Sequence, residues 1–564
     1  MLKKSDNEFV SKNNFRKTGK KNIPRRRFLG GIGAAAVAAA VGCRDRSGTK
    51  KEVDGGVDPD GGQDGGHDGG EHDSVPPQVT GLVQTGATTN SIAMSWNATQ
   101  NADTYNIYLN GATEPVKTSI TSAAATLSAL DAETDYDVQV SGVNEFGEGE
   151  KSEPVKMTTA APNMASSVSQ HAITWDFDGE HQVGQYANGD WWVLGPVTIT
   201  SITPESQTVD DRVINGTMIN PTHDHSSTAQ GYDSHPSDMN YDSSLNVAPN
   251  YTGENLVVSE GSVVSSIYRP DPPSGGRPII SDLAILTVVS EVPPSGAFRP
   301  HPFGTDKTSY WTESQLNYDI LQSLPHVDNV PNLQARSEQA LKFWNEHDTN
   351  WQQRAVQASN NQPVYGREIA NRNGEMLLLL HLDFTNAEKR DLFVGLVQQG
   401  LDTYGRLLEG GRWVSNGGHN AGRKMPMLLA GLALGDQEII SAADRDEDDD
   451  RFQEDGQTFI VSQEDVDRGV GYTSDWIGTP EWGIRHASDP SRDDPSWSAS
   501  YRWIGSAMIG HGLAARLTPG AMEAWNWPPF FAYMDRYFDE DTRPTNDTNG
   551  IQAFQRSMWE AYRN

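Results

Sequence analysis

Alternation of apolar and polar residues marks the first folded part of the chain, between residues 76 and 162. Short runs at 91–96, 105–108 and 136–140 alternate with a period of two, and turn-forming residues separate them. Successive side chains of a strand point to opposite faces of a sheet, so this pattern predicts strands with one buried face. We therefore expect a small all-β domain here.

The pattern changes along the rest of the chain. Residues 171–304 carry alternating or continuously apolar runs, rich in β-branched residues, at 172–177, 191–202 and 281–292. From residue 305 to residue 564, apolar residues recur at helical spacing instead. This predicts a multidomain chain in which a β-rich domain (171–304) precedes an α-helical domain (305–564).

The helical spacing also predicts individual helices and their ends. Asn420 is a plausible N-cap and Gly435 a plausible C′ residue for one of them. Helices are expected at 313–324, 333–347, 374–382, 387–408, 425–434, 501–517, 529–538 and 551–562.

The first 43 residues have the composition of a secretory signal. Residues 25–29 (Arg-Arg-Arg-Phe-Leu) precede an apolar stretch at 30–41, which is shorter than the roughly 20 residues that a spanning helix needs. Residues 25–29 resemble the twin-arginine export motif, and residues 40–43 resemble a lipobox in which Cys43 would be lipidated. We expect an exported protein, lipid-anchored to the bacterial cell envelope at the outer membrane or cell surface. The alternative for Cys43 is a buried, inert cysteine.

A Gly/Asp-rich segment follows the signal, at 44–75. Residues 54–70 read DGGVDPDGGQDGGHDGG and offer almost no apolar surface to offset the entropy of ordering, so we expect a disordered linker. Calcium binding is the alternative, but the repeat lacks the bidentate carboxylate and spacing of a calcium loop.

Composition restricts the classes of partner. The chain has 44 basic and 76 acidic residues, a formal charge of −32, and ten of the basic residues precede Cys43. Removing them with the signal would leave 34 basic and 74 acidic residues, a net charge of −40. Such acidity argues against nucleic acid and against anionic lipid, so contact with the membrane would be through the lipid anchor only. A single cysteine permits no internal disulfide, so stability must come from buried cores.

The all-β segment carries recognisable landmarks. Trp96 lies at the end of an early strand run, the stretch 130–136 ends in Thr134-Asp135-Tyr136, and residues 143–147 read Val-Asn-Glu-Phe-Gly. These features resemble a fibronectin type III domain over residues 76–162. The resemblance implies a seven-strand sandwich without a catalytic site, used as a spacer or adhesive module.

A dense polar cluster lies at 410–424, directly before an expected helix. Glycines there surround an amide, an imidazole and cations, and a helix N-terminus suits a carboxylate ligand. We expect Asn416, His419, Arg423, Trp413 and Lys424 to lie at a ligand site. The alternative is that Asn420 merely caps the helix and that Arg423 makes a structural ion pair.

A second cluster, at 471–503, is rich in aromatic rings and arginine. Flat rings can stack on sugars, and guanidinium groups match carboxylates bidentately. We also expect His486 and Tyr501 to lie at this site. Residues expected to contact substrate are Tyr472, Trp476, Trp482, Arg485, Trp497 and Arg502. The alternative is aromatic packing beneath a long loop, which we prefer for Trp503.

Several short motifs lie within residues 306–564: Asn416 with His419, Gly-Arg-Lys-Met-Pro at 422–426, Tyr501-Arg502, and the segment 525–536. They resemble helical-toroid polysaccharide lyases of the alginate and glucuronan lyase type. The resemblance implies an α/α toroid-like domain that cleaves uronic-acid polymers by β-elimination. Such lyases usually place the toroid before a β domain, and the order is reversed here.

The resemblance also implies roles for individual side chains. Asn416 and Arg423 would neutralise the substrate carboxylate, His419 or His486 would remove the C5 proton, and Tyr501 would protonate the leaving oxygen. The expected partner is therefore an acidic polysaccharide, with no nucleic acid and no required cofactor.

Two other functions stay open. A glycoside hydrolase would use paired carboxylates, for which Glu481 and Asp475 are available. A non-catalytic surface protein would bind or adhere to carbohydrate through the same aromatic residues. The binding protein is distinguished from an enzyme by whether His419 and Tyr501 reach one cleft, and the hydrolase is distinguished from the lyase by new reducing ends without ultraviolet absorbance.

A metal site is a weaker possibility. His223 and His225, with Asp233 and His235 nearby, carry ligands that zinc prefers. The segment has a loop-like composition, and the alternative is a polar loop lining a cleft.

Overall fold

The computed structural model describes residues 74–128, 130–221, 229–235, 240–271, 278–344, 356–363, 365–415, 417–445, 451–469, 472–483, 503–541 and 550–564. Cys43, the signal and nearly all of the expected linker lie outside these residues. Among the described helices, none has the length and apolarity that crossing a membrane requires.

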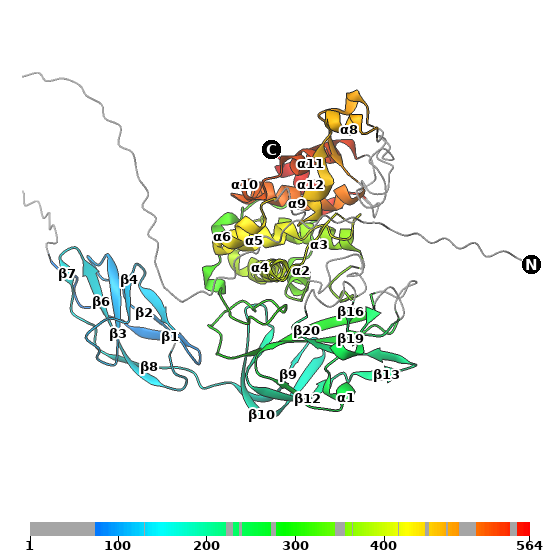
Figure 1. Ribbon diagram of the computed structural model, residues 1–564. Helices are drawn as coiled ribbons and strands as arrows, with labels where there is room; N and C mark the ends of the chain where they lie inside the picture. Colours follow the sequence, from blue (N-terminus) through cyan, green and yellow to red (C-terminus); the bar gives the residue numbers. More distant parts are fainter. Residues whose placement is uncertain are drawn as a thin grey trace, which may run out of the picture. The chain divides into compact units, whose positions relative to one another are not determined.

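The first described part is a β-sandwich of two antiparallel sheets, seen in blue and cyan in Figure 1. Its three-stranded sheet contains β1 (Val83–Ala87), β2 (Ile92–Ser95) and β5 (Ala124–Leu127). Its five-stranded sheet contains β3 (Thr104–Leu109), β4 (Lys117–Ile120), β6 (Asp135–Asn144), β7 (Gly147–Glu148) and β8 (Val155–Thr158). The expected strands are present, and β7 is a two-residue addition to the seven that the sequence predicted.

Trp96 and Tyr136, two of the residues on which the resemblance rested, have clear structural roles in this sandwich. The ring of Trp96 lies edge-on to Tyr105, with centroids 5.3 Å apart, and both belong to the buried core. Tyr136 turns its hydroxyl to the backbone, where it accepts a hydrogen bond from the amide of Asp131 at 2.8 Å. This contact pins the start of β6 to the preceding corner.

The β-rich region is built on one large mixed sheet, in the order β15-β19-β20-β11-β10-β12-β18, with β9 also pairing with β10. The central strands are long apolar runs whose side chains, among them Trp175 and Leu286, are fully buried. The strands are β9 (Met164–Gln170), β10 (Ile173–Gln185), β11 (Trp191–Leu194), β12 (Val197–Thr203), β15 (Thr217–Ile219), β18 (Leu256–Val258), β19 (Gly261–Tyr268) and β20 (Ile280–Val289). Smaller two-stranded pairs are β13 (Gln207–Val209) with β14 (Arg212–Ile214), and β16 (Ala229–Gln230) with β17 (Asn240–Tyr241).

The C-terminal region is helical and shares one large apolar core. Helix α3 packs against α9, and α4 packs against α2 and α5; Figure 1 draws these helices in green, yellow and orange. The helices of the described chain are α1 (Pro249–Thr252), α2 (Leu333–Ala340), α3 (Gly366–Leu379), α4 (Asn386–Leu408), α5 (Lys424–Leu434), α6 (Gln437–Ala442), α7 (Gln453–Gln457), α8 (Gln463–Asp467), α9 (Trp503–Leu517), α10 (Ala521–Trp525), α11 (Pro528–Glu540) and α12 (Ala553–Tyr562). A short hairpin, β21 (Thr458–Ile460) with β22 (Pro480–Trp482), lies between α7 and α9 along the chain.

One expected helix is wrong. Residues 313–324 form two separate 3-10 turns, Glu313–Gln315 and Tyr318–Ile320, with Leu316 extended between them. Asn317 causes the break, because its side chain accepts from the amide of Asp319 and starts the second turn. The backbone N–H of Asn317 instead donates to Ala433 at the end of α5. The apolar residues therefore pack on the helical core from an irregular segment.

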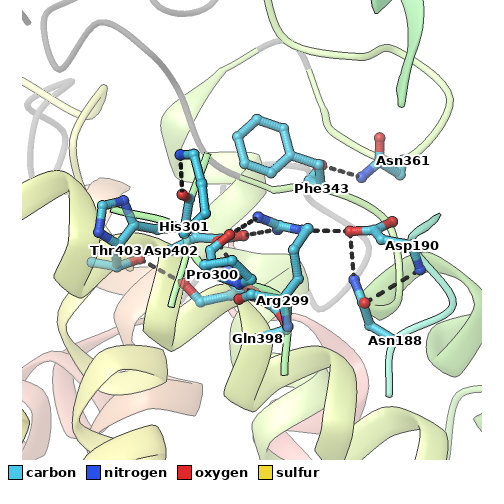
Figure 2. Close-up of polar contacts among 12 residues, drawn as sticks. Asn188, Asp190, Arg299, Pro300, His301, Phe343, Asn361, Gln398, Asp402 and Thr403 are labelled. Atoms are coloured by element: carbon cyan, nitrogen blue, oxygen red, sulfur yellow. Dashed lines mark hydrogen bonds and ion pairs between the residues drawn. The ribbon is translucent and has the colours of Figure 1, made fainter. Parts of the chain in front are cut away.

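A buried ionic network links the β-rich region to the helical region (Figure 2). The guanidinium of Arg299, which follows β20, donates to Asp190 at 2.5 Å and to Asp402 of α4 at 2.6 Å. Gln398, one turn before Asp402, holds the backbone of Arg299 through both its amide oxygen and its amide nitrogen. Burial raises the pKa of Asp402 to about 6, and Arg299 opposes that shift. The network thus joins a strand-end loop to α4 through charges hidden from water.

Candidate functional site

The candidate site is built on the connection between α4 and α5. We call residues 417–423 the His419 loop. His419 is partly exposed, and its ring lies edge-on to Tyr365 with centroids 4.4 Å apart. Tyr365 directly precedes α3, so two chain segments far apart in sequence bring an imidazole and a phenol together at the start of that helix. A histidine and a tyrosine in contact are groups that can exchange protons with a substrate.

Glycines allow these segments to approach closely. A side chain at Gly366 would overlap the carbonyl oxygen of His419, and one at Gly418 would overlap Ile504 and approach Tyr365. Ile504 belongs to the first turn of α9, so the start of α9 also reaches the His419 loop. Close packing therefore requires glycine at position 366, against the backbone of His419, and at position 418, against the side chains of Ile504 and Tyr365.

Helix α7 lies against the His419 loop and bonds to its backbone. The amide of Gln453 accepts from the N–H of Asn420 at 3.1 Å and donates to the carbonyl of Gly417 at 2.8 Å. The next residue, Glu454, accepts from the N–H of Gly422 at 2.7 Å. These three hydrogen bonds hold the loop through the buried side chains of Gln453 and Glu454.

Asp455, which follows Glu454 in α7, forms an ion pair with Lys424, the first residue of α5. Asp455 accepts from Lys424 at 2.6 Å, and its other oxygen accepts from the indole of Trp525 at 2.9 Å. Lys424 is 0% exposed and also donates to the carbonyl of Trp525. Burial raises the pKa of Asp455 and lowers that of Lys424, and their mutual attraction opposes both shifts. Lys424 was expected to contact substrate; it lies instead in a buried structural pair.

The expected N-cap is wrong. Helix α5 begins at Lys424, and Arg423 occupies the cap position without a side-chain cap bond. Asn420 is buried before the helix, where its side chain donates to the carbonyl of Val414 at 2.8 Å. His419 and Arg423 therefore precede the first turn of α5. The C′ prediction is confirmed, because Gly435 has φ 67° and ends the helix.

Arg423 is 2% exposed, and its guanidinium donates to the carbonyl of Ala421 at 2.5 Å. In this placement it supports the loop and is screened from solvent, which differs from the expected direct contact with a substrate carboxylate.

Two of the expected stacking residues are core residues. Trp413 is 0% exposed and stacks on Phe452 at 5.7 Å with an interplanar angle of 3°. Trp482, also 0% exposed, packs against Tyr533 with centroids 5.6 Å apart. As placed, neither ring has a face on which a sugar could stack, and the packing alternative describes both.

Tyr472 and Trp476 lie together near the β21–β22 hairpin. Their ring centroids are 5.5 Å apart, and the guanidinium of Arg536 lies 5.5 Å from the centroid of Trp476. Tyr472 is buried, whereas Trp476 keeps part of its surface exposed. Of the two, Trp476 retains the surface that a sugar contact would need.

Several expected site residues lie outside the described part of the chain. They are Asn416, Arg485, His486, Trp497, Tyr501, Arg502, His223 and His225. Their roles stay predictions.

The carboxylates expected for a hydrolase have contrasting environments. Glu481 is 0% exposed, and its oxygens lie 3.5 Å from the guanidinium of Arg536 and 3.0 Å from the N–H of Trp482. Asp475 is exposed on a 3-10 turn. A buried, ion-paired Glu481 is a structural group as placed.

Metal ligands do not cluster within the described ranges. No group of three or more His, Cys, Asp or Glu side chains able to hold a metal occurs there. Asp233, the acidic residue near the two histidines, accepts two hydrogen bonds of 2.7 Å each from the guanidinium of Arg212.

Sequence reasoning missed Tyr365, Gln453 and Glu454. Each lies outside the two clusters, and only the tertiary fold brings them to the His419 loop. A signal was present for Tyr365, which precedes a glycine at the start of an amphipathic helix. The Gln-Glu-Asp sequence at 453–455 follows an acidic run and resembles a solvated surface segment.

Substitution Gly366→Ala should disturb the site through packing alone. The new Cβ would overlap the backbone of His419, so the helix start or the loop must shift. We expect the free energy of unfolding to fall by about 1–3 kcal/mol, as for overpacked cores. Urea unfolding followed by circular dichroism measures this. Gly179→Ala, where no atom lies within 4 Å, is the control, and equal stability of both variants would contradict the close approach.

Comparisons with known proteins concern small parts of the chain. It is 36% identical over 75 residues to the tail tube protein gp17.1* of Bacillus phage SPP1, covering 13% of this chain and 28% of that protein. It is 39% identical over 120 residues to the poly(3-hydroxybutyrate) depolymerase of Ralstonia pickettii, covering 21% of this chain and 24% of that protein. The chain thus spans about a quarter of the length of these curated relatives.

Solved structures match over similarly short stretches. The fibronectin type III domain of human fibronectin type III domain containing protein 3 is 22% identical, with a TM-score of 0.15, covering 16% of this chain and 94% of that one. The family 28 exopolygalacturonase of Yersinia enterocolitica is 18% identical, with a TM-score of 0.14, covering 16% and 20%. The family model for the fibronectin type III domain matches residues 76–158. Residues 76–158 therefore form a fibronectin type III domain, as the sequence predicted.

Proposed function

We propose that this protein is an exported, lipid-anchored enzyme that cleaves a uronic-acid polysaccharide by β-elimination, with its chemistry in the helical region. The observation that carries the proposal is the contact of His419, on the loop to which α7 is hydrogen-bonded, with Tyr365 at the start of α3. A base and an acid in fixed geometry are what a proton-abstracting reaction requires.

The proposed reaction assigns a role to each group. His419 takes the C5 proton, the C4–O bond breaks as the C4–C5 double bond forms, and a tyrosine protonates the leaving oxygen. Tyr365 is the acid supported by contact geometry, and Tyr501 is the acid implied by the resemblance to lyases. Asn416 neutralises the substrate carboxylate, and Arg423 acts through the loop it supports.

A relative's name, the burial of Glu481 and the charge of the chain also bear on the proposal. The relative from Ralstonia pickettii is named a depolymerase, which agrees with a polymer-cleaving role, although the shared part is 24% of that protein. Glu481 is buried and lies 3.5 Å from Arg536, which favours the lyase over a hydrolase that would use Glu481 with Asp475. A protein of net charge −40 repels polyanions, so the cleft would need local cations such as Arg485 and Arg502.

Incubation with alginate, glucuronan and other polyuronates tests the proposal. A lyase generates unsaturated ends, which absorb in the ultraviolet. New reducing ends without that absorbance would identify a hydrolase. Retention of the polymer on the protein without cleavage would identify a binding protein, and either result would reject the lyase.

The anchor has its own test. Cys43→Ala should release the mature protein from the membrane fraction, because no other residue can carry the expected thioether-linked lipid. Immunoblots of membrane and soluble fractions, with the wild-type protein as control, measure the distribution. Unchanged membrane association would contradict a lipid anchor at this residue.

A further inference from the structure

Three consecutive side chains of α7 hold the chain from Gly417 to Lys424. Gln453 bonds to Gly417 and Asn420, Glu454 bonds to Gly422, and Asp455 pairs with Lys424. All three side chains are fully or almost fully buried, at 0–4% exposure. The mechanism proposed above uses none of them directly.

Glu454 differs from its two neighbours in that only half of its carboxyl group is bonded. Its Oε1 accepts from Gly422, whereas its Oε2 is buried without a partner among the described residues. Burying a carboxylate oxygen without a hydrogen-bond donor raises the free energy of the folded state. A carboxylic acid with a proton on that oxygen is neutral and avoids the cost of burying a charge. The one-sided bonding of Glu454 therefore fits the protonated form.

We propose that Glu454 is a positioning residue that keeps the His419 loop closed while it holds a proton. Deprotonation places a negative charge in a dry site beside a second carboxylate, Asp455, and so favours opening of the loop. The catalytic consequence rests on the proposed function; the coupling of loop and proton does not.

The charges around Glu454 agree with this role. Burial raises its pKa to about 7 and Asp455 adds to the rise, while its own backbone N–H, the N–H of Gly422 and the cation of Lys424 oppose it. Lys424 is already paired with Asp455 at 2.6 Å. From α9, His511 lies near Gly422; burial lowers its pKa to about 4, so it stays neutral where Glu454 titrates. Arg423 acts on His511 in the same direction.

The sign of the pH dependence follows from proton linkage. Glu454 has a pKa of about 7 in the closed loop and near its ordinary value of 4.5 once exposed. Between those values the open state binds fewer protons, so closure is strongest at low pH and weakens as pH rises. The opening constant should rise up to about tenfold per pH unit between about pH 5 and 7, and then level off.

Amide hydrogen exchange of the intact protein tests this without any substrate. The reporters are the amides of Asn420 and Gly422, measured from pH 5 to pH 7.5 and corrected for intrinsic exchange. Glu454→Gln keeps an acceptor for Gly422 and cannot ionise, so its opening constant should be independent of pH. Glu454→Ala removes the acceptor and should exchange fast at every pH. Glu464→Gln, at a carboxylate 80% exposed, should behave as the wild type.

Two results would overturn the role: a wild-type opening constant that does not rise with pH, or a Glu454→Gln variant that rises as the wild type does. A protein that cleaves no polyuronate but shows the expected exchange would reject the proposed function and leave this positioning role in place.

Discussion

Replacing His419 with Ala should lower kcat for polyuronate cleavage by about 10²–10⁴-fold, the range typical for loss of a general base. The imidazole is the titratable group of the loop that keeps exposed surface, whereas Arg423 and Lys424 beside it are buried. Circular dichroism should remain unchanged, because His419 is a partly exposed loop residue. Initial rates of ultraviolet absorbance at saturating polymer measure the effect.

Matched controls separate chemistry from structure. His326→Ala removes a histidine whose side chain is 45% exposed, and it should leave kcat unchanged. Tyr365→Phe keeps the edge-on ring contact with His419 and removes only the hydroxyl, whereas Tyr310→Phe does so at a tyrosine 52% exposed. Full activity of the His419→Ala variant would remove the base from this loop. A lower kcat in Tyr365→Phe, with an unchanged kcat in Tyr310→Phe, would favour Tyr365 over Tyr501 as the acid.

Local patterns predicted the β-sandwich and the change from β-rich to helical structure along the chain. Period-two alternation and the Tyr136 corner predicted the sandwich, because neighbouring residues along the chain determine which face of a strand is buried and where a turn forms. Gly435 marked the end of α5 for the same reason. Residues 313–324 failed because Asn317 bonds to the neighbouring turn and to Ala433, a contact that no periodicity contains.

The candidate site was less predictable than the fold. The His419 loop stood out because glycines surround polar residues there, but Tyr365 and Glu454 reach it only through the tertiary fold. Burial also reverses the roles expected from residue type. Trp413 became a core ring and Lys424 half of an ion pair, since lysine is fully buried almost only when paired.

Substitution Arg299→Leu should lower the free energy of unfolding by about 3–5 kcal/mol, the largest stability effect expected in this chain. It would leave the carboxylates of Asp190 and Asp402 buried together without their shared cation. Urea unfolding at pH 7, followed by intrinsic fluorescence, measures the loss. Arg468→Leu breaks an exposed ion pair with Glu464, 58% and 80% exposed, and should cost less than about 1 kcal/mol.

The pH dependence of Arg299→Leu distinguishes loss of charge pairing from loss of packing. Without the guanidinium, the buried carboxyl group of Asp402, whose pKa burial already raises to about 6, gains stability by taking up a proton. Because the folded state then binds more protons than the unfolded state, the variant should recover stability as pH falls from 7 towards 5. A companion variant that adds Asp190→Asn and Asp402→Asn should recover at every pH, since no buried charge remains. A deficit in Arg299→Leu that is constant between pH 5 and 7 would mean that Arg299 stabilises the junction through contact area and not through its charge.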